Sequence, residues 1–162
     1  MLAYRRGDAD AFEHLYQRHK DGLFSFLFRS LPRPALAEEL AQDTWMAVVR
    51  AAPDYEPRAR FRTWLFQIAR NRVIDHWRRS DNSEEPLLDE PASHDESCTP
   101  SERELLAAVA ALPQEQRDAL LLREQGFSVK DVAAITDAAE ETVKSRIRYG
   151  RRTLQDWLEA QQ

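Results

Sequence analysis

The chain contains little cysteine and little glycine. Its 162 residues include four glycines and a single cysteine, Cys98. One cysteine excludes an internal disulfide and a metal site built from several cysteines. We interpret Cys98 as an incidental exposed thiol, with a redox sensor as the less favoured alternative. The shortage of glycine, together with abundant Ala, Leu, Arg and Glu, predicts an all-α fold.

Motifs of catalysis and membrane insertion are also missing. The densest apolar stretch, residues 22–28 (GLFSFLF), is far too short to span a bilayer, and the first ten residues contain no hydrophobic signal-peptide core. The four histidines are scattered, and no phosphate-binding loop or catalytic triad is recognisable. The sequence therefore predicts a soluble cytoplasmic protein that is not an enzyme and has no cofactor or metal.

Negative charge is concentrated in one segment. The chain has a formal net charge of −5, yet residues 1–79 carry +4, residues 80–102 carry −8 and residues 103–162 carry −1. The acidic segment contains three prolines and no aromatic residue, which is the composition of a flexible linker. We therefore predict two small helical domains, residues 1–79 and 103–162, joined by a flexible acidic linker over residues 80–102. The net acidity does not argue against nucleic-acid binding by either domain.

The N-terminal domain is predicted to form three main helices. Asp8 is a good N-cap for the first helix, and Pro34 suits the first turn of the second. The third helix is expected over residues 61–79, where two apolar stripes indicate a central helix packed on two sides. The second helix exposes several acids, but no histidine stands at a partner spacing. A solvated or protein-contacting face is therefore favoured over a metal site or acid–base catalysis.

The C-terminal domain has the pattern of a helix-turn-helix. Pro113 opens a helix that ends before Gly126, and Ser128 forms a capping box with Asp131 at the start of a short helix. A tight connection then leads into a longer basic helix. In a helix-turn-helix, the second helix enters the major groove of DNA.

The last helix has two distinct faces on a helical wheel. Val143, Ile147 and Gly150 fall on an apolar arc, so Gly150 is predicted to allow the close approach of another helix. The opposite face carries Ser145 and Arg148, which suit contacts with bases and phosphates. Taken alone, this face is equally typical of a solvated helix. The short helix and turn that precede it favour DNA binding.

Three motifs follow one another along the chain: AEELAQDTWMAVVRAA, FRTWLFQIARNRVIDHWRR and ETVKSRIR. The predicted linker lies between the second and the third. With these motifs the chain resembles the extracytoplasmic-function (ECF) sigma factors of bacterial RNA polymerase. The resemblance implies an N-terminal sigma region 2 and a C-terminal sigma region 4. It also implies that the chain directs RNA polymerase to promoters, enables transcription initiation in a stress or signal response, and performs no covalent chemistry.

The resemblance implies three sets of functional residues. The set matching the segment that binds the clamp helices of the polymerase β′ subunit is Glu38, Glu39, Gln42, Asp43 and Trp45. The set matching the surface that captures melted minus-ten bases is Asp54, Tyr55, Arg58, Arg60, Arg62, Gln67, Arg70, Asn71 and Arg78. The set matching the helix that reads the minus-thirty-five element is Glu141, Lys144, Ser145, Arg148, Tyr149, Arg151 and Arg152. Without the resemblance, residues 54–62 are more typical of a polar inter-helix loop than of a base-stacking site.

The implied partners are core RNA polymerase, through its β′ clamp helices and β flap, promoter DNA, and an anti-sigma factor that would hold the protein at the inner membrane. No small-molecule substrate is implied. Two departures from the family pattern weaken the expected reading helix: Asp137 replaces the usual Gly of the turn, and Ala139 replaces a Ser-like N-cap. Two alternatives remain, a stand-alone helix-turn-helix regulator and a sigma-like decoy that binds polymerase without reading DNA.

Overall fold

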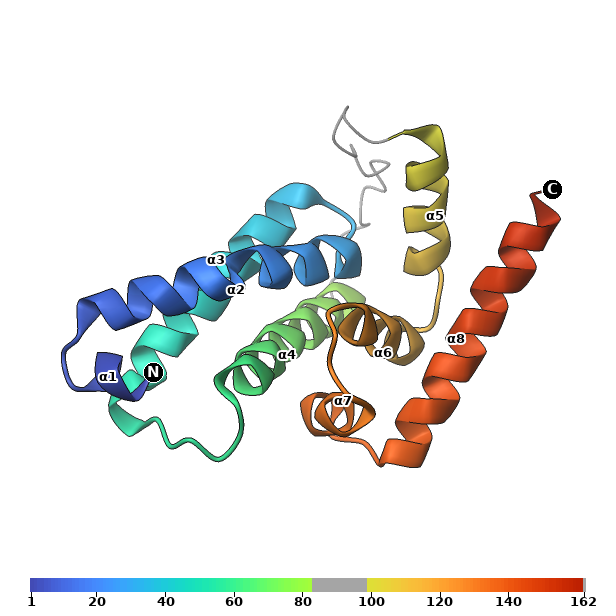
Figure 1. Ribbon diagram of the computed structural model, residues 1–162. Coiled ribbons are helices and arrows are strands. Elements are labelled where there is room, and N and C mark those ends of the chain that lie inside the picture. Colours follow the sequence, from blue (N-terminus) through green and yellow to red (C-terminus); the bar gives the residue numbers. More distant parts are fainter. Residues whose placement is uncertain (83–98, 162) are drawn as a thin grey trace.

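The computed structural model describes residues 1–82 and 99–161, and both ranges are largely helical (Figure 1). The elements are α1 (Leu2–Arg5), α2 (Ala9–Ser30), α3 (Pro34–Ala51), a 3₁₀-helix η1 (Ala52–Asp54), α4 (Phe61–Asn82), α5 (Pro100–Ala110), α6 (Gln114–Glu124), α7 (Val129–Thr136) and α8 (Glu140–Ala160). No strand occurs in these two ranges, and the all-α prediction is confirmed. Cys98 and most of the predicted linker lie outside the described residues.

Local signals place the helices of the N-terminal module, residues 1–82. Asp8 caps α2, and its carboxylate accepts a hydrogen bond from the amide nitrogen of Ala11 at 3.1 Å. Pro34 occupies the first turn of α3, where its missing N–H removes no helical hydrogen bond. Both starts are as predicted. The sequence pattern does not indicate α1 or η1, because each is too short to show a period.

Helix ends in the C-terminal module, residues 99–161, also follow capping rules. Thr99 and Glu102 form a capping box at the start of α5, and Ser128 and Asp131 form the predicted one at the start of α7. Gly126 follows α6 with a φ of +86°, a conformation that favours glycine. These caps set the starts of α5 and α7 and the end of α6.

The helices extend beyond the domain limits predicted from composition. α4 runs to Asn82 rather than ending at Arg79, and α5 begins at Pro100, inside the predicted linker. The start at Pro100 has a local cause, since Thr99 caps the helix and proline suits its first turn. Composition is averaged over many residues, so it misses a signal carried by three or four of them.

α7 and α8 form the predicted helix-turn-helix. Asp137 makes the turn in the left-handed conformation, with φ 49° and ψ 51°, which aspartate tolerates better than most residues. α8 packs against α6, and Gly150 is buried in this contact. A Cβ atom on Gly150 would lie 2.8 Å from Cδ1 of Leu120. The close approach predicted for this glycine is confirmed.

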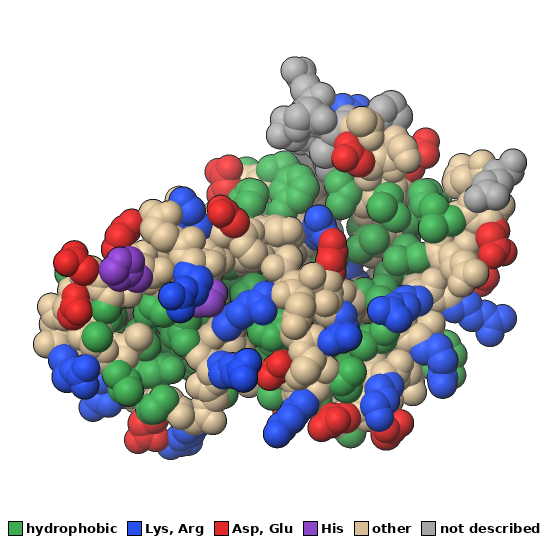
Figure 2. Space-filling model, in the orientation of Figure 1, with side chains coloured by type: hydrophobic (Ala, Val, Ile, Leu, Met, Phe, Trp, Pro, Cys, Tyr) green, Lys and Arg blue, Asp and Glu red, His purple; other side chains and the backbone are tan. Residues whose placement is uncertain are grey.

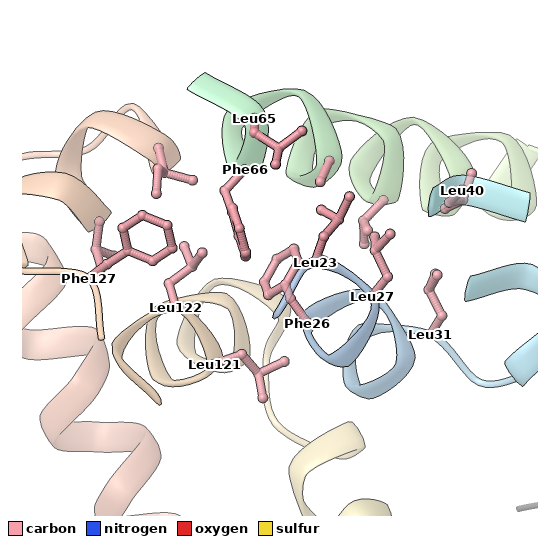
Figure 3. Close-up of a cluster of buried hydrophobic side chains, with 14 of the residues drawn as sticks. Leu23, Phe26, Leu27, Leu31, Leu40, Leu65, Phe66, Leu121, Leu122 and Phe127 are labelled. Atoms are coloured by element: carbon pink, nitrogen blue, oxygen red, sulfur yellow. The ribbon is translucent and has the colours of Figure 1, made fainter. Parts of the chain in front are cut away.

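The two modules share one hydrophobic core (Figure 3). The ring of Phe66 in α4 lies 5.6 Å from that of Phe26 in α2 and 4.9 Å from that of Phe127, which follows α6. α2 also packs against α5 and α6, and α4 packs against α7. The sequence analysis predicted a flexible linker, and such a linker does not indicate whether the two modules touch. The packing of the two modules against each other is therefore known only from the structure.

Candidate nucleic-acid interface

The solvent side of α8 carries the set predicted to read duplex DNA. We call this surface the reading face. Its members, all exposed except the partly exposed Ser145, are Glu141, Lys144, Ser145, Arg148, Tyr149, Arg151 and Arg152. Lys and Arg side chains follow α8 in the space-filling view (Figure 2). The guanidinium of Arg148 lies 5.2 Å from the ring centroid of Tyr149, within the range of a cation–π contact.

Glu141 is the one acidic member of the reading face, and it pairs with a neighbour. Its Oε1 lies 2.5 Å from Nζ of Lys144, and both side chains are largely exposed. The hydrogen bond to Glu141, and then its negative charge, raise the pKa of Lys144 above its ordinary value. An exposed pair of this kind is weak, so Lys144 can exchange the carboxylate for a phosphate.

A basic hollow of about 480 Å³ beside α8 includes a residue that the sequence analysis missed. Arg123 of α6 lines it together with Lys144, Arg148 and Arg151 of α8. Arg123 donates a hydrogen bond to the carbonyl oxygen of Phe127. A search along a single helix cannot find Arg123, because it reaches the hollow beside the reading face only when α6 packs against α8.

The loop before α4 presents cations but buries its aromatic residue. Arg58 is exposed and lies 2.7 Å from the carboxylate of Glu56. Tyr55 is only 6% exposed, and its ring packs 4.8 Å from that of Trp64. Stacking of Tyr55 on an unpaired base, the less favoured interpretation of residues 54–62, does not fit this arrangement, because its ring already has a protein partner. The exposed members of the predicted set in this loop are Asp54, Arg58 and Arg60.

The rest of the minus-ten set lies along α4. We call it the polar face of α4, and it consists of Arg62, Gln67, Arg70, Asn71 and Arg78. Arg62 donates a hydrogen bond to the carbonyl oxygen of Gln125, and Nε2 of Gln67 donates one to the carbonyl oxygen of Ala134 at 2.9 Å. Both acceptors belong to the C-terminal module, so part of the predicted DNA surface is engaged within the chain.

Arg70 of the same face forms a buried ion pair with α6. Its Nε lies 2.9 Å from Oδ2 of Asp118, and the two side chains are 11% and 0% exposed. Burial raises the pKa of this aspartate, while the nearby charges of Arg70, Arg117 and Arg146 act in the opposite direction. No sequence motif marks Asp118, and the helical pattern of α6 gives no sign that this charged residue is buried together with Ala119 and Leu122.

The set predicted to contact polymerase lies on α3 beside an apolar groove. Its exposed members are Glu38, Glu39, Gln42 and Asp43. Trp45 is only 8% exposed, because its ring packs 5.9 Å from Phe12 and 5.1 Å from Tyr16. Trp45 therefore contributes to the wall of the groove, which has a volume of about 670 Å³. Met46, 50% exposed, also lines the groove and was missed by the sequence analysis.

The functional candidates in residues 1–82 and 99–161 are surfaces and grooves. Within these ranges, no group of three or more His, Cys, Asp or Glu side chains is placed to hold a metal ion. None of the helices described is long and apolar enough to cross a membrane. The arrangement presents charged faces and grooves of the size that other macromolecules contact.

Comparison with known proteins identifies the family. The model for Sigma-70 region 2 matches residues 15–83, and the model for Sigma-70, region 4 matches residues 102–154. The RNA polymerase sigma factor CarQ of Myxococcus xanthus is 33% identical over 98% of this chain and 95% of its own length. The ECF RNA polymerase sigma factor RpoE of Cereibacter sphaeroides is 36% identical over 87% and 82% of the two chains. The chain belongs to the ECF sigma factors.

Two solved structures share the fold of this sigma factor. The sigma factor RpoE of Bartonella quintana, solved with the anti-sigma factor NepR, matches with a TM-score of 0.83 and 27% identity over 95% of this chain and all of that one. CnrH, solved with the cytosolic domain of CnrY, matches with a TM-score of 0.77 and 26% identity over 99% and 96% of the two chains. The family resemblance and the helix-turn-helix fold are confirmed.

Membership establishes the general function. An ECF sigma factor recognises promoters for RNA polymerase through regions 2 and 4, and it is not an enzyme. The interpretation as a stand-alone helix-turn-helix regulator is therefore wrong, because residues 15–83 match a sigma region and not a sensor domain.

Proposed function

We propose that the reading face of α8 contacts the minus-thirty-five element as duplex DNA. Arginine can donate two hydrogen bonds to guanine, and serine and lysine suit phosphates. The opposite side of α8 is buried through Val143, Ile147 and Gly150, which directs the basic side toward solvent. The observation that carries this assignment is an exposed, cation-rich helix face in a chain of net charge −5.

The loop before α4 and the polar face of α4 are the proposed contacts for the melted minus-ten element. Extruding a base from the stack costs a few kcal/mol, and contacts with the captured base and its phosphates offset part of that cost. Arg58 and Arg60 are exposed beside the loop and suit phosphate contacts. Tyr55 supports the loop through Trp64, because its ring is buried there.

The acidic face of α3 and the adjoining groove are the proposed site for core RNA polymerase, at the clamp helices of its β′ subunit. Exposed carboxylates beside apolar side chains suit a partner that presents cations around an apolar patch. Trp45 and Met46 supply apolar surface in the groove. The C-terminal module is the proposed partner of the β flap.

Control by an anti-sigma factor is part of the proposal. RpoE of Bartonella quintana was solved with the anti-sigma factor NepR, and CnrH with the cytosolic domain of CnrY. An anti-sigma factor of this sigma factor would release it in response to a signal. The proposed location is the bacterial cytoplasm, where RNA polymerase works, with retention at the inner membrane by that partner.

Run-off transcription with core RNA polymerase and a promoter library tests the assignment. The wild-type chain should initiate on a subset of promoters. Arg148→Ala should reduce discrimination among minus-thirty-five sequences by roughly 5- to 150-fold, the value of one bidentate base contact. Binding to core polymerase, measured by co-elution, should be unchanged, because Arg148 lies on α8 and not on α3.

Arg103→Ala is the matched control, since it removes one exposed positive charge from the same module but from α5. It should leave promoter discrimination as in the wild type. An equal loss on every promoter would instead make Arg148 a phosphate contact. Polymerase binding by the wild-type chain without any initiation would support the decoy interpretation.

A further inference from the structure

The start of the loop before α4 is held by α1, a helix that the sequence pattern does not indicate. Nη1 of Arg5, the last residue of α1, donates a hydrogen bond to the carbonyl oxygen of Tyr55 at 2.9 Å. The two residues are 50 positions apart in the chain. α1 also packs against η1, which ends one residue before Tyr55. The first helix of the chain therefore contacts the loop that carries part of the proposed minus-ten surface.

α1 is itself fixed on α2. The ring of Tyr4 lies 4.9 Å from that of Phe12 in α2. The connection between the two helices is a tight turn, in which the amide nitrogen of Gly7 donates a hydrogen bond to the carbonyl oxygen of Tyr4 at 2.9 Å. Arg5 therefore belongs to a short helix that is anchored to the rest of the N-terminal module.

Tyr55 is the anchored end of the loop. Its amide nitrogen donates a hydrogen bond to the carbonyl oxygen of Ala52 at 3.3 Å, and its ring packs against Trp64. Its carbonyl oxygen accepts the hydrogen bond from Arg5. The backbone on both sides of the Tyr55 Cα is thus held, and Arg5 supplies the hold on the side that leads into the loop.

The residues that follow Tyr55 are exposed and are tied mainly to one another. Residues 56–60 are all exposed. The amide nitrogen of Arg58 donates a hydrogen bond to the carbonyl oxygen of Glu56 at 2.8 Å, and its guanidinium pairs with the carboxylate of the same residue. These bonds join residues two positions apart, so they shape the loop without attaching it to the module. The direction in which the loop leaves the module is therefore set at Tyr55.

We propose that Arg5 is a positioning residue for minus-ten recognition, which sets the course of residues 56–60 by holding the carbonyl oxygen of Tyr55. The inference rests on the proposed function of this loop. Because the peptide unit is planar, the direction of that carbonyl fixes where the next residue lies. Without the hydrogen bond the loop samples several courses, and capture of a base must then offset the entropy lost in ordering them. In this role Arg5 contacts Tyr55 and not the DNA.

Run-off transcription with core polymerase, on promoters that differ only in the minus-ten element, tests this role. Arg5→Ala should reduce discrimination among these promoters roughly two- to tenfold, the effect expected for loss of one hydrogen bond. The ratio of initiation on two promoters does not depend on the folded fraction, so a loss of stability alone would not change it. Arg5→Lys keeps a charged donor and should restore most of the discrimination. Binding to a minus-thirty-five duplex should equal that of the wild type in both variants.

Arg6→Ala is the matched control, because it removes the same charge one residue later, at the exposed C-cap of α1. It should leave minus-ten discrimination as in the wild type. An equal loss in Arg5→Ala and Arg6→Ala would overturn the proposal, and so would no loss in Arg5→Ala. Weaker initiation by Arg5→Ala to the same degree on every promoter would also overturn it, since Arg5 would then be a phosphate contact.

A second variant tests whether α1 acts through Arg5. Tyr4→Ala removes the ring that packs against Phe12, so it should lower minus-ten discrimination in the same direction as Arg5→Ala. The double variant should lose no more than Arg5→Ala alone, because both changes release the same carbonyl oxygen. Additive losses in the double variant would contradict the proposal.

A variant of the loop itself separates failure of this proposal from failure of the proposed function. Arg58→Ala combined with Arg60→Ala removes the two exposed arginines of the loop and should weaken initiation on every promoter. Unchanged initiation in this double variant would refute the proposed function of the loop. A loss there, together with unchanged discrimination in Arg5→Ala, would refute only the role of Arg5.

Discussion

Two arginine-rich helix faces of this sigma factor lie in opposite environments. The reading face of α8 is exposed, whereas the polar face of α4 donates hydrogen bonds to the C-terminal module. Both faces contain three arginines and uncharged polar side chains, and both are proposed DNA contacts. The difference shows that residue type predicts what a face can bind, whereas packing decides when it is free to bind.

The number of apolar stripes on each helix explains the difference. α8 has one apolar face, which is buried through Val143, Ile147 and Gly150, so its other side remains in solvent. α4 has two, and Phe66 of one of these stripes packs against Phe127 of the other module. A polar face between two buried stripes has neighbours on both sides. Its long side chains therefore meet protein carbonyl and carboxylate oxygens.

The largest change in stability is expected when the carboxylate that pairs with the polar face of α4 is removed. Asp118→Ala leaves Arg70, whose side chain is 11% exposed, without its partner inside the protein. Removal of one member of a buried ion pair costs about 3–5 kcal/mol. Chemical denaturation should show a loss of that size in the free energy of unfolding.

Glu115→Ala is the matched control, because it also removes an α6 carboxylate that pairs with an arginine. Oε2 of Glu115 lies 2.8 Å from Nη2 of Arg146, but its side chain is 63% exposed. The free energy of unfolding should fall by only about 0–1 kcal/mol. Equal losses in the two variants would show that the α4 face is not held by a buried charge.

The second largest change in stability is expected on the buried side of α8. Packing of this side against α6 keeps the reading face in solvent. A Cβ atom on Gly150 would lie 2.8 Å from Cδ1 of Leu120 and 3.4 Å from Cβ of Gln116. Gly150→Leu overfills this contact and should lower the free energy of unfolding by about 1–3 kcal/mol. Thr153→Leu, at an exposed position of α8, should change it by less than about 0.5 kcal/mol. Thermal unfolding of both variants measures the difference, and identical melting would contradict the close packing of α8 on α6.

The α8 side of the comparison could be predicted from the sequence because its signals are local. The capping box of Ser128 and Asp131, the turn at Asp137 and the inward position of Gly150 each depend on residues within a few helical turns. Patterns that span only a few helical turns can be recognised in a single sequence. The resemblance to ECF sigma factors rests on motifs of similar length, and the comparisons confirm it.

The α4 side could be predicted only in part. Two apolar stripes indicate a central helix, but they do not say which element covers the second one. The acceptor of Arg62, the carbonyl of Gln125, is 63 positions away in the chain. No pattern in the intervening linker specifies such a contact. The pairing of Arg70 with Asp118 depends on the same long-range packing, so it has no signal in the sequence.

The smallest change in stability is expected from adding a capping side chain at the start of α8. Ala139 takes the N-cap position with φ −67° and ψ 148°, the extended geometry that a capping serine adopts, but alanine has no side-chain acceptor. Ala139→Ser should raise the free energy of unfolding by about 1 kcal/mol, because the hydroxyl accepts a hydrogen bond from a first-turn N–H. Ala138→Ser, one residue before the cap, should bring no gain. If stability rose equally in both variants, the N-cap would not be the source of the gain, and α8 would not begin at Glu140.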